Sequence, residues 1–167
     1  MGKAFVTGVM GGSTCTDKQW NIAEKVGRLI AKSGAVLLCG GGKGVMEASA
    51  KGAYEAGGLT IGILPGPSSK AANPYISIPI VTNLGDARNP INILSSKLIV
   101  AIGGAGGTLS EIALAVKNNR PVIGIDTCSF QFSDGLDSDL FEEFNDFESA
   151  QSRLQQFINE LMEQDRQ

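Results

Sequence analysis

The sequence predicts an α/β protein whose mainly parallel sheet is doubly wound and flanked by helices. Three observations lead to this fold class. Short apolar runs alternate along the chain with segments of helical period, as they do where helices connect parallel strands. The runs are apolar at nearly every position, which indicates strands that are buried on both faces. Clusters of glycine follow several of these runs.

Five continuous apolar runs with β-branched residues predict the buried strands, at residues 4–9, 35–39, 59–64, 98–102 and 122–125. A sixth segment, residues 76–81, alternates apolar residues with small or polar ones and contains Pro79. Proline has no N–H to donate to a neighbouring strand. We therefore expect this segment to be an edge strand or an extended stretch.

Helical period predicts five helices, at residues 17–33, 44–56, 87–96, 107–118 and 147–164. The first is amphipathic and stops at Gly34, and the third can hold Pro90 only in its first turn. The last has an apolar stripe typical of core packing or a subunit contact. Residues 129–146 are acidic and aromatic, and we expect a covering loop there. Strand, glycine-rich turn and helix repeat in the order of a Rossmann-like fold.

The chain has 167 residues, of which 43% are hydrophobic and 19% charged, so we expect one folded domain over residues 1–167. There is no histidine, which excludes Ser-His-Asp and Cys-His catalysis and histidine-ligated zinc. The three cysteines are widely spaced and fit a reducing compartment. The first residues lack the apolar region of a signal peptide, and no run is long enough to span a membrane. We expect a cytoplasmic protein with no membrane partner.

Charge is distributed unevenly between the two parts of the chain. Residues 1–129 carry 12 Lys and Arg against 7 Asp and Glu, whereas residues 130–167 carry 2 against 10. The glycine-rich part is thus mildly basic, which favours a small anionic ligand. A nucleic acid would require a strongly basic face, so we expect no nucleic-acid partner.

Glycine makes up 22 of the 167 residues, about 13% against a usual ~7%, and it gathers where strands end. In an open parallel sheet the carboxyl ends of the strands form the ligand crevice. Glycine lets the backbone approach a phosphate, and the N–H groups that begin a helix attract anions. The expected binding residues are Gly11, Gly12, Ser13, Gly41, Gly42, Lys43, Gly104, Gly106, Gly107 and Thr108.

Two common nucleotide motifs are absent from these clusters. Gly42-Lys43 is followed by Gly44, so the P-loop pattern GxxxxGK[ST] is not met. The first cluster is preceded by Gly8-Val9-Met10 and lacks the GxGxxG fingerprint of dinucleotide sites. Tight turns alone would need fewer glycines, so an anion site is the better interpretation.

Five motifs occur in order along the chain: GGGKGVMEA at residues 40–48, IGILPG at 61–66, ANPY at 72–75, ARN at 87–89 and GGTLSEIA at 106–113. As a set they resemble the LOG-related (SLOG) superfamily. This group, once misnamed lysine decarboxylases, includes phosphoribohydrolases that activate cytokinins and carrier proteins for the molybdenum cofactor. The pattern is nearer to the carrier branch. The resemblance implies a homo-oligomer, a dimer or a tetramer, that binds a small phosphorylated ligand.

For the phosphoribohydrolases, the resemblance implies that Arg88 and Glu111 are catalytic. A carboxylate near the ribose can stabilise the positive charge that forms when an N-glycosidic bond breaks, and an arginine can orient it. Hydrolysis would require no metal or other cofactor. The sequence departs from the hydrolase motif, since Gly103 replaces a proline, Ala105 a glycine and Asn89 a lysine.

Two functions therefore stay open. One is hydrolysis of a nucleoside 5′-monophosphate such as AMP at its N-glycosidic bond. The other is carriage of a phosphorylated pterin, the molybdenum cofactor, without chemistry. The role of Glu111 is open as well, because Thr108 and Glu111 have the spacing of a capping box that would only stabilise a helix.

Overall fold

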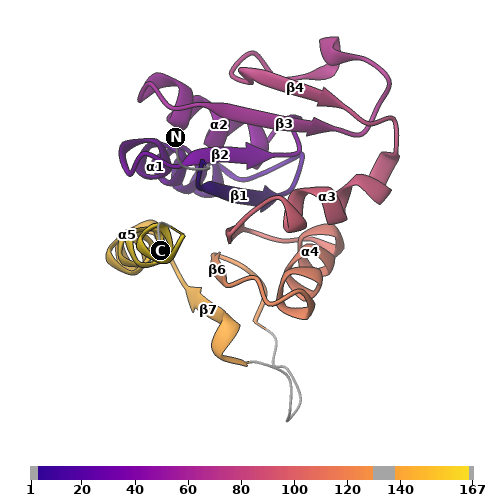
Figure 1. Ribbon diagram of the computed structural model, residues 1–167. Coiled ribbons are helices and arrows are strands. Elements are labelled where there is room, and N and C mark those ends of the chain that lie inside the picture. Colours follow the sequence, from indigo (N-terminus) through magenta and orange to yellow (C-terminus); the bar gives the residue numbers. More distant parts are fainter. Residues whose placement is uncertain (1–3, 130–137, 166–167) are drawn as a thin grey trace.

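The computed structural model describes residues 4–129 and 138–165, and their strands form a parallel sheet in the order β4-β3-β2-β1-β5-β6-β7 (Figure 1). The strands are β1 (Val6–Gly11), β2 (Val36–Cys39), β3 (Thr60–Leu64), β4 (Ile78–Val81), β5 (Leu98–Ile102), β6 (Val122–Ile125) and β7 (Phe141–Phe144). The chain builds outward from β1 to β4, returns to the other side of β1 with β5, and continues to β7. This reversal confirms the doubly wound fold.

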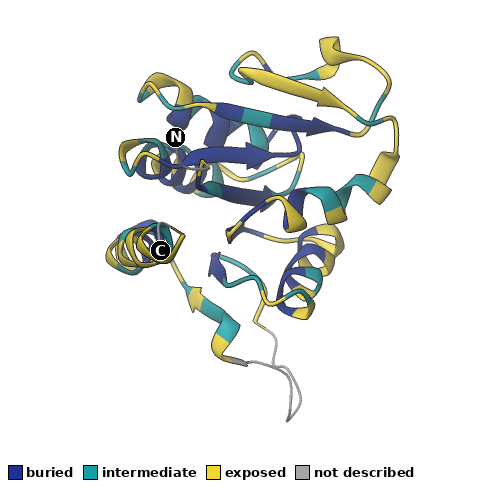
Figure 2. Cartoon of the chain, viewed as in Figure 1, coloured by how far each residue is buried: buried dark blue, intermediate teal, exposed yellow. Residues whose placement is uncertain are grey.

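The helices form two layers, one on each face of the sheet. They are α1 (Asp17–Lys32), α2 (Val45–Glu55), α3 (Asn89–Leu94), α4 (Gly106–Lys117) and α5 (Phe147–Gln164). Buried residues of α1, α2 and α5 pack with one set of strand side chains. Those of α3 and α4 pack with the other set. Figure 2 shows the result, with the central strands buried and β4 exposed.

All five predicted helices are present, with small changes at their ends. Thr16 caps α1, accepting a hydrogen bond from the N–H of Gln19, and Gly34 follows the helix with φ of +78°. The predicted segment 87–96 is divided, because residues 85–88 form a 3₁₀ helix before α3 begins at Asn89. Pro90 then lies in the first turn, where its missing N–H costs no helical hydrogen bond. In the described part of the chain no helix is long and apolar enough to cross a membrane.

The two edges of the sheet test two further expectations. The segment with Pro79 is the outermost strand β4, as predicted. The covering loop expected over residues 129–146 is wrong for residues 138–144, because a 3₁₀ helix leads into β7, which pairs with β6. Its acidic residues do not prevent pairing, since Glu142 accepts hydrogen bonds from Arg153 of α5. Residues 130–137 of the expected loop lie outside the described residues.

Helices α1 and α2 approach each other at two glycines. A Cβ on Gly27 would overlap the carbonyl oxygen of Ser49, and a Cβ on Gly52 would overlap that of Glu24. The absence of both side chains lets the two backbones touch.

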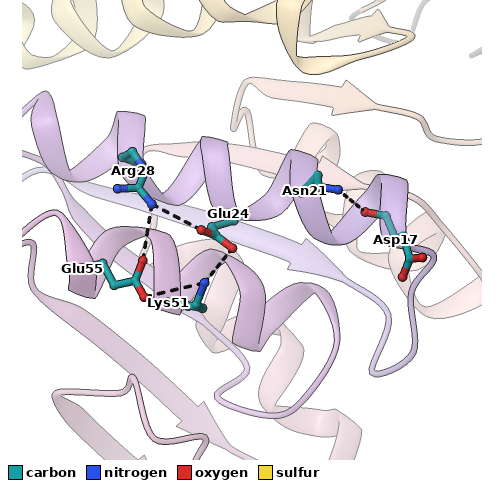
Figure 3. A network of polar contacts seen from close by, with 6 residues as sticks. All are labelled: Asp17, Asn21, Glu24, Arg28, Lys51 and Glu55. Carbon is teal, nitrogen blue, oxygen red and sulfur yellow. Dashed lines mark hydrogen bonds and ion pairs between the residues drawn. The ribbon is translucent and has the colours of Figure 1, made fainter.

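A charged network spans the same interface beside the glycines (Figure 3). Arg28 of α1 lies 3.3 Å from a carboxylate oxygen of Glu24 and 3.4 Å from one of Glu55. Lys51 of α2 lies 3.0 Å from Glu24 and 3.6 Å from Glu55. All four side chains are partly exposed, so solvent screens these pairs and each contributes little stability.

These contacts predict that Gly52→Ala destabilises the protein more than loss of the ion pairs does. The added methyl group must push the helices apart, which typically costs about 1–3 kcal/mol. Lys51→Ala, which removes two solvent-screened ion pairs one residue away, should cost clearly less than that. Urea unfolding of both variants measures the difference. Equal losses would show that the helices do not depend on backbone contact here.

Candidate functional site

A cavity of about 290 Å³ lies at the carboxyl ends of β1 and β5. The winding of the sheet reverses between these two strands, so the loops that follow them leave on opposite faces and open a crevice. Its walls come from the end of β1, from the segment 86–92 and from the start of α4. The lining residues are Val9, Met10, Gly11, Gly12, Ser13, Gly40, Met46, Asp86, Arg88, Asn89, Asn92, Ala105, Gly107, Thr108 and Glu111.

Backbone contacts hold the loops after β1 and β2 together. A Cβ on Gly11 would overlap Val45, and one on Gly44 would lie 2.5 Å from the carbonyl oxygen of Gly12. That same oxygen accepts a hydrogen bond of 3.1 Å from the N–H of Val45. Gly44 also has φ of +64°, a conformation that other residues rarely adopt. Glycine is therefore required here to join two loops, whether or not a ligand is bound.

Asn73 holds the loop after β2 from its other side. Its side-chain amide donates to the carbonyl oxygens of Gly42 at 2.8 Å and Gly41 at 3.2 Å, and its backbone N–H donates to Gly41 at 2.9 Å. Asn73 is buried. The carbonyl groups of these two glycines thus accept hydrogen bonds from the protein itself, which fixes the shape of the loop without a ligand.

Helix α4 begins at Gly106 with Ala105 as its N-cap, and no side chain caps it. The first N–H groups of a helix have no partner within it, so this end attracts an anion. Gly107 lines the cavity, and a Cβ placed on it would meet no atom within 4 Å. The space in front of the first turn is open.

The structure excludes the capping interpretation of Glu111. The helix begins two residues before Thr108, so Thr108 lies inside the first turn and cannot serve as the N-cap of a capping box. Both side chains are buried, and both line the cavity. The capping hypothesis is therefore wrong, because the helix starts earlier than the Thr-x-x-Glu spacing indicates.

Arg88 lies across the cavity from α4. Its Nη1 donates to the carbonyl oxygen of Ile63 at 2.9 Å, and its guanidinium packs over Gly40, where a Cβ would overlap it. Its Nε is buried and has no partner among the described residues. Burial lowers the pKa of Arg88, while the negative charge of Glu111 opposes this change. One contact to the backbone fixes the side chain and leaves donors for a ligand.

Burial raises the pKa of Glu111 to about 7. The positive charge of Arg88 acts in the opposite direction, and the negative charge of Asp86 adds to the rise. A large fraction of Glu111 is therefore protonated near neutral pH. In that form the carboxyl can donate a hydrogen bond to an anion instead of repelling it.

Asn92 is a site residue that the sequence analysis missed. It is fully buried on α3, and neither its Oδ1 nor its Nδ2 has a hydrogen-bond partner among the described residues. A buried amide without partners is costly, and a ligand in the cavity could supply them. A polar residue between Ile91 and Ile93 was the available signal. Asp86 and Asn89, which flank Arg88, were missed as well.

The expected site residues, both the binding residues and the catalytic pair Arg88 and Glu111, fall into three groups. Those that line the cavity are Gly11, Gly12, Ser13, Arg88, Gly107, Thr108 and Glu111. Those that line a neighbouring cavity instead are Gly42 and Lys43. Those that line neither cavity are Gly41, Gly104 and Gly106. Gly41 packs against Gly62 and Leu64 with φ of +74°, so its side of the loop faces the protein. Within the described residues, no group of three or more Cys, Asp or Glu side chains could hold a metal ion.

The raised pKa of Glu111 predicts that Glu111→Gln stabilises the free protein at high pH. Ionising Glu111 is harder in the folded than in the unfolded protein, so stability falls as pH rises from 4.5 to about 7. The difference corresponds to roughly 3 kcal/mol. The variant should be more stable than the wild type by about that amount at pH 8, and by less than about 1 kcal/mol at pH 5.

Urea unfolding at the two pH values measures this effect. Glu163→Gln, at an exposed position near the end of α5, is the control and should change neither value. If the advantage of Glu111→Gln is the same at pH 5 and pH 8, the carboxyl does not titrate in this range.

The fold and the sequence of this chain are similar to those of proteins with solved structures. The molybdenum cofactor binding protein from the phototrophic bacterium Rippkaea orientalis has 39% sequence identity to this chain and a TM-score of 0.84. The match covers 93% of this chain and 98% of that protein. The molybdenum cofactor carrier protein from Chlamydomonas reinhardtii has 41% identity and a TM-score of 0.84, over 94% of this chain and 99% of its own.

Sequence comparison extends the relationship to an archaeon. A protein of uncharacterised function from Archaeoglobus fulgidus is 45% identical over 123 residues, which cover 74% of this chain and 81% of that protein. Residues 4–160 match the SLOG cluster4 family. This range includes every element from β1 to β7 and the greater part of α5. The chain therefore belongs to the SLOG cluster4 family.

Proposed function

We propose that this protein binds a phosphorylated pterin of the molybdenum cofactor type and carries it without chemical change. One observation carries the proposal. The cavity at the carboxyl ends of β1 and β5 combines the uncapped start of α4 with Arg88. The fold around it matches two molybdenum cofactor proteins over more than nine tenths of the chain. The features of this chain's own cavity support such a ligand independently.

The charges of the cavity suit a phosphate monoester. Gly107 brings the first turn of α4, with its free N–H groups, to the cavity, and Arg88 offers charged donors from another wall. Thr108 adds a hydroxyl group. Glu111 can be present in its protonated form, so its carboxyl can bind a phosphate oxygen as a donor. The unpartnered amide of Asn92 supplies one further donor and acceptor.

Hydrolysis of a nucleoside 5′-monophosphate is the second candidate. The observation that favours it is the buried carboxyl of Glu111, which lies close enough to Arg88 for the two charges to interact. Two features favour carriage instead. A carboxylate must be ionised to stabilise a cationic transition state, and burial opposes ionisation of Glu111. Gly103, Ala105 and Asn89 also replace residues of the hydrolase motif.

The proposed anion site predicts that Gly107→Asp weakens phosphate binding by at least about 100-fold. The new side chain has room, so the fold should persist, and its charge and bulk occupy the place of the anion. Ser110→Asp adds the same charge to an exposed position of α4 that does not line the cavity, and it should cost less than about tenfold because solvent screens it. Titration calorimetry with a pterin phosphate compares the two. Equal affinity of Gly107→Asp and the wild type would place the anion elsewhere.

A chromatographic assay separates carriage from hydrolysis. Purified protein incubated with AMP should release no adenine, and Glu111→Gln should bind a pterin phosphate with an affinity within about threefold of the wild type, because Gln can still donate a hydrogen bond. Release of adenine by the wild type, lost in Glu111→Gln, would instead establish a phosphoribohydrolase and make Glu111 its carboxylate.

A further inference from the structure

A second cavity of about 400 Å³ adjoins the first. The two share Ser13, Gly40, Met46 and Arg88 as lining residues, so they lie side by side and meet at these four residues. The remaining walls come from the loop after β2 and from the segment after β3. They are Gly42, Lys43, Leu64, Pro65 and Ala71.

The chemistry of the second cavity differs from that of the first. Its side chains are apolar at Met46, Leu64, Pro65 and Ala71, and the glycines leave bare backbone. Lys43 is exposed and contributes charge at the rim. The carboxyl and amide groups of the first cavity have no counterpart in this lining. The two cavities therefore suit different parts of one ligand.

The walls of the second cavity are held by the protein itself. Asn73 binds the carbonyl groups of the loop after β2, as described above. On the opposite wall, the hydroxyl of Thr82 donates to the carbonyl oxygen of Leu64 at 2.7 Å, and the N–H of Gly85 donates to that of Pro65 at 3.0 Å. A site with walls fixed in advance loses less entropy when a rigid ligand enters.

Two residues at the junction are suited to a flat aromatic ring. The thioether of Met46 packs beside Gly40 and Gly42, and methionine sulfur makes favourable contacts with aromatic rings. Arg88 lies over Gly40 with its planar guanidinium, which can stack on a ring while it also binds an anion. The space beside Gly40 and Gly42 is filled by these two side chains, so a ring in the second cavity would meet the thioether and the guanidinium.

We propose that the second cavity is a ring subsite, which holds the heterocycle of the ligand while the first cavity holds its phosphate. The proposal rests on the function proposed above, and it adds where the ring lies and which residues select it. Arg88 contacts both parts of the ligand. Affinity then comes from two subsites, and phosphate alone should bind weakly.

The test blocks the ring subsite and leaves the phosphate subsite intact. Ala71 is exposed and lies at the end of a short 3₁₀ helix, so Ala71→Trp can fill the second cavity from its rim. The matched control is Ser69→Trp, an exposed position of the same turn that lines neither cavity. The probes are neopterin monophosphate, whose ring fluorescence reports binding, and inorganic phosphate, followed by calorimetry.

We expect the wild type and Ser69→Trp to bind neopterin monophosphate at least tenfold more tightly than inorganic phosphate. Ala71→Trp should lose that advantage, and Ala71→Phe should lose part of it. Both variants should keep the wild-type affinity for inorganic phosphate, which also shows that they are folded.

Two negative results would have different meanings. If Ala71→Trp binds neopterin monophosphate as tightly as the wild type does, the ring lies elsewhere, and the ring subsite is overturned while the proposed function stands. If the wild type binds the pterin phosphate no more tightly than inorganic phosphate, the ring adds no affinity, and the proposed function fails together with the subsite.

Discussion

Strand β1 pairs in parallel with β2 on one side and with β5 on the other, and the other features of this protein depend on that double pairing. It makes β1 the point where the direction of winding reverses. The loops after β1 and β5 leave on opposite faces, which leaves a cavity at the carboxyl ends of these strands in the described part of the chain. The crevice is thus a consequence of strand order, and the residues of the loops decide only what it can bind.

The glycines serve the scaffold as much as the ligand. Gly27 and Gly52 bring α1 against α2, and Gly11 and Gly44 bring the loops above these helices into contact. Asn73 then completes the loop after β2. These contacts produce a surface that is formed largely of fixed backbone. Few side chains in it need to be ordered when a ligand binds. Preorganisation of this kind contributes to affinity by reducing the entropy lost on binding.

The same cavity contains groups that reduce the stability of the free protein. Glu111 is buried in a position that raises its pKa to about 7, and the amide of Asn92 lacks hydrogen-bond partners among the described residues. Stability lost at such groups can be recovered when a ligand satisfies them. Both groups line the cavity together with the uncapped start of α4, and this combination is the physical basis for proposing that the ligand binds in this cavity.

The sequence by itself determined the buried strands β1, β2, β3, β5 and β6, because a run buried on both faces must be apolar throughout. It also placed Pro79 on an edge strand, because proline lacks an N–H. It also singled out Arg88, Glu111, Gly11, Gly12 and Gly107, all of which line the cavity. Tertiary structure alone decided that Glu111 faces the cavity, that Gly41 faces the protein, and that residues 141–144 form β7. Local periodicity records which face of an element is buried. It does not record contacts such as that of Asn73 with Gly42, between residues 31 positions apart, which set the orientation of a loop.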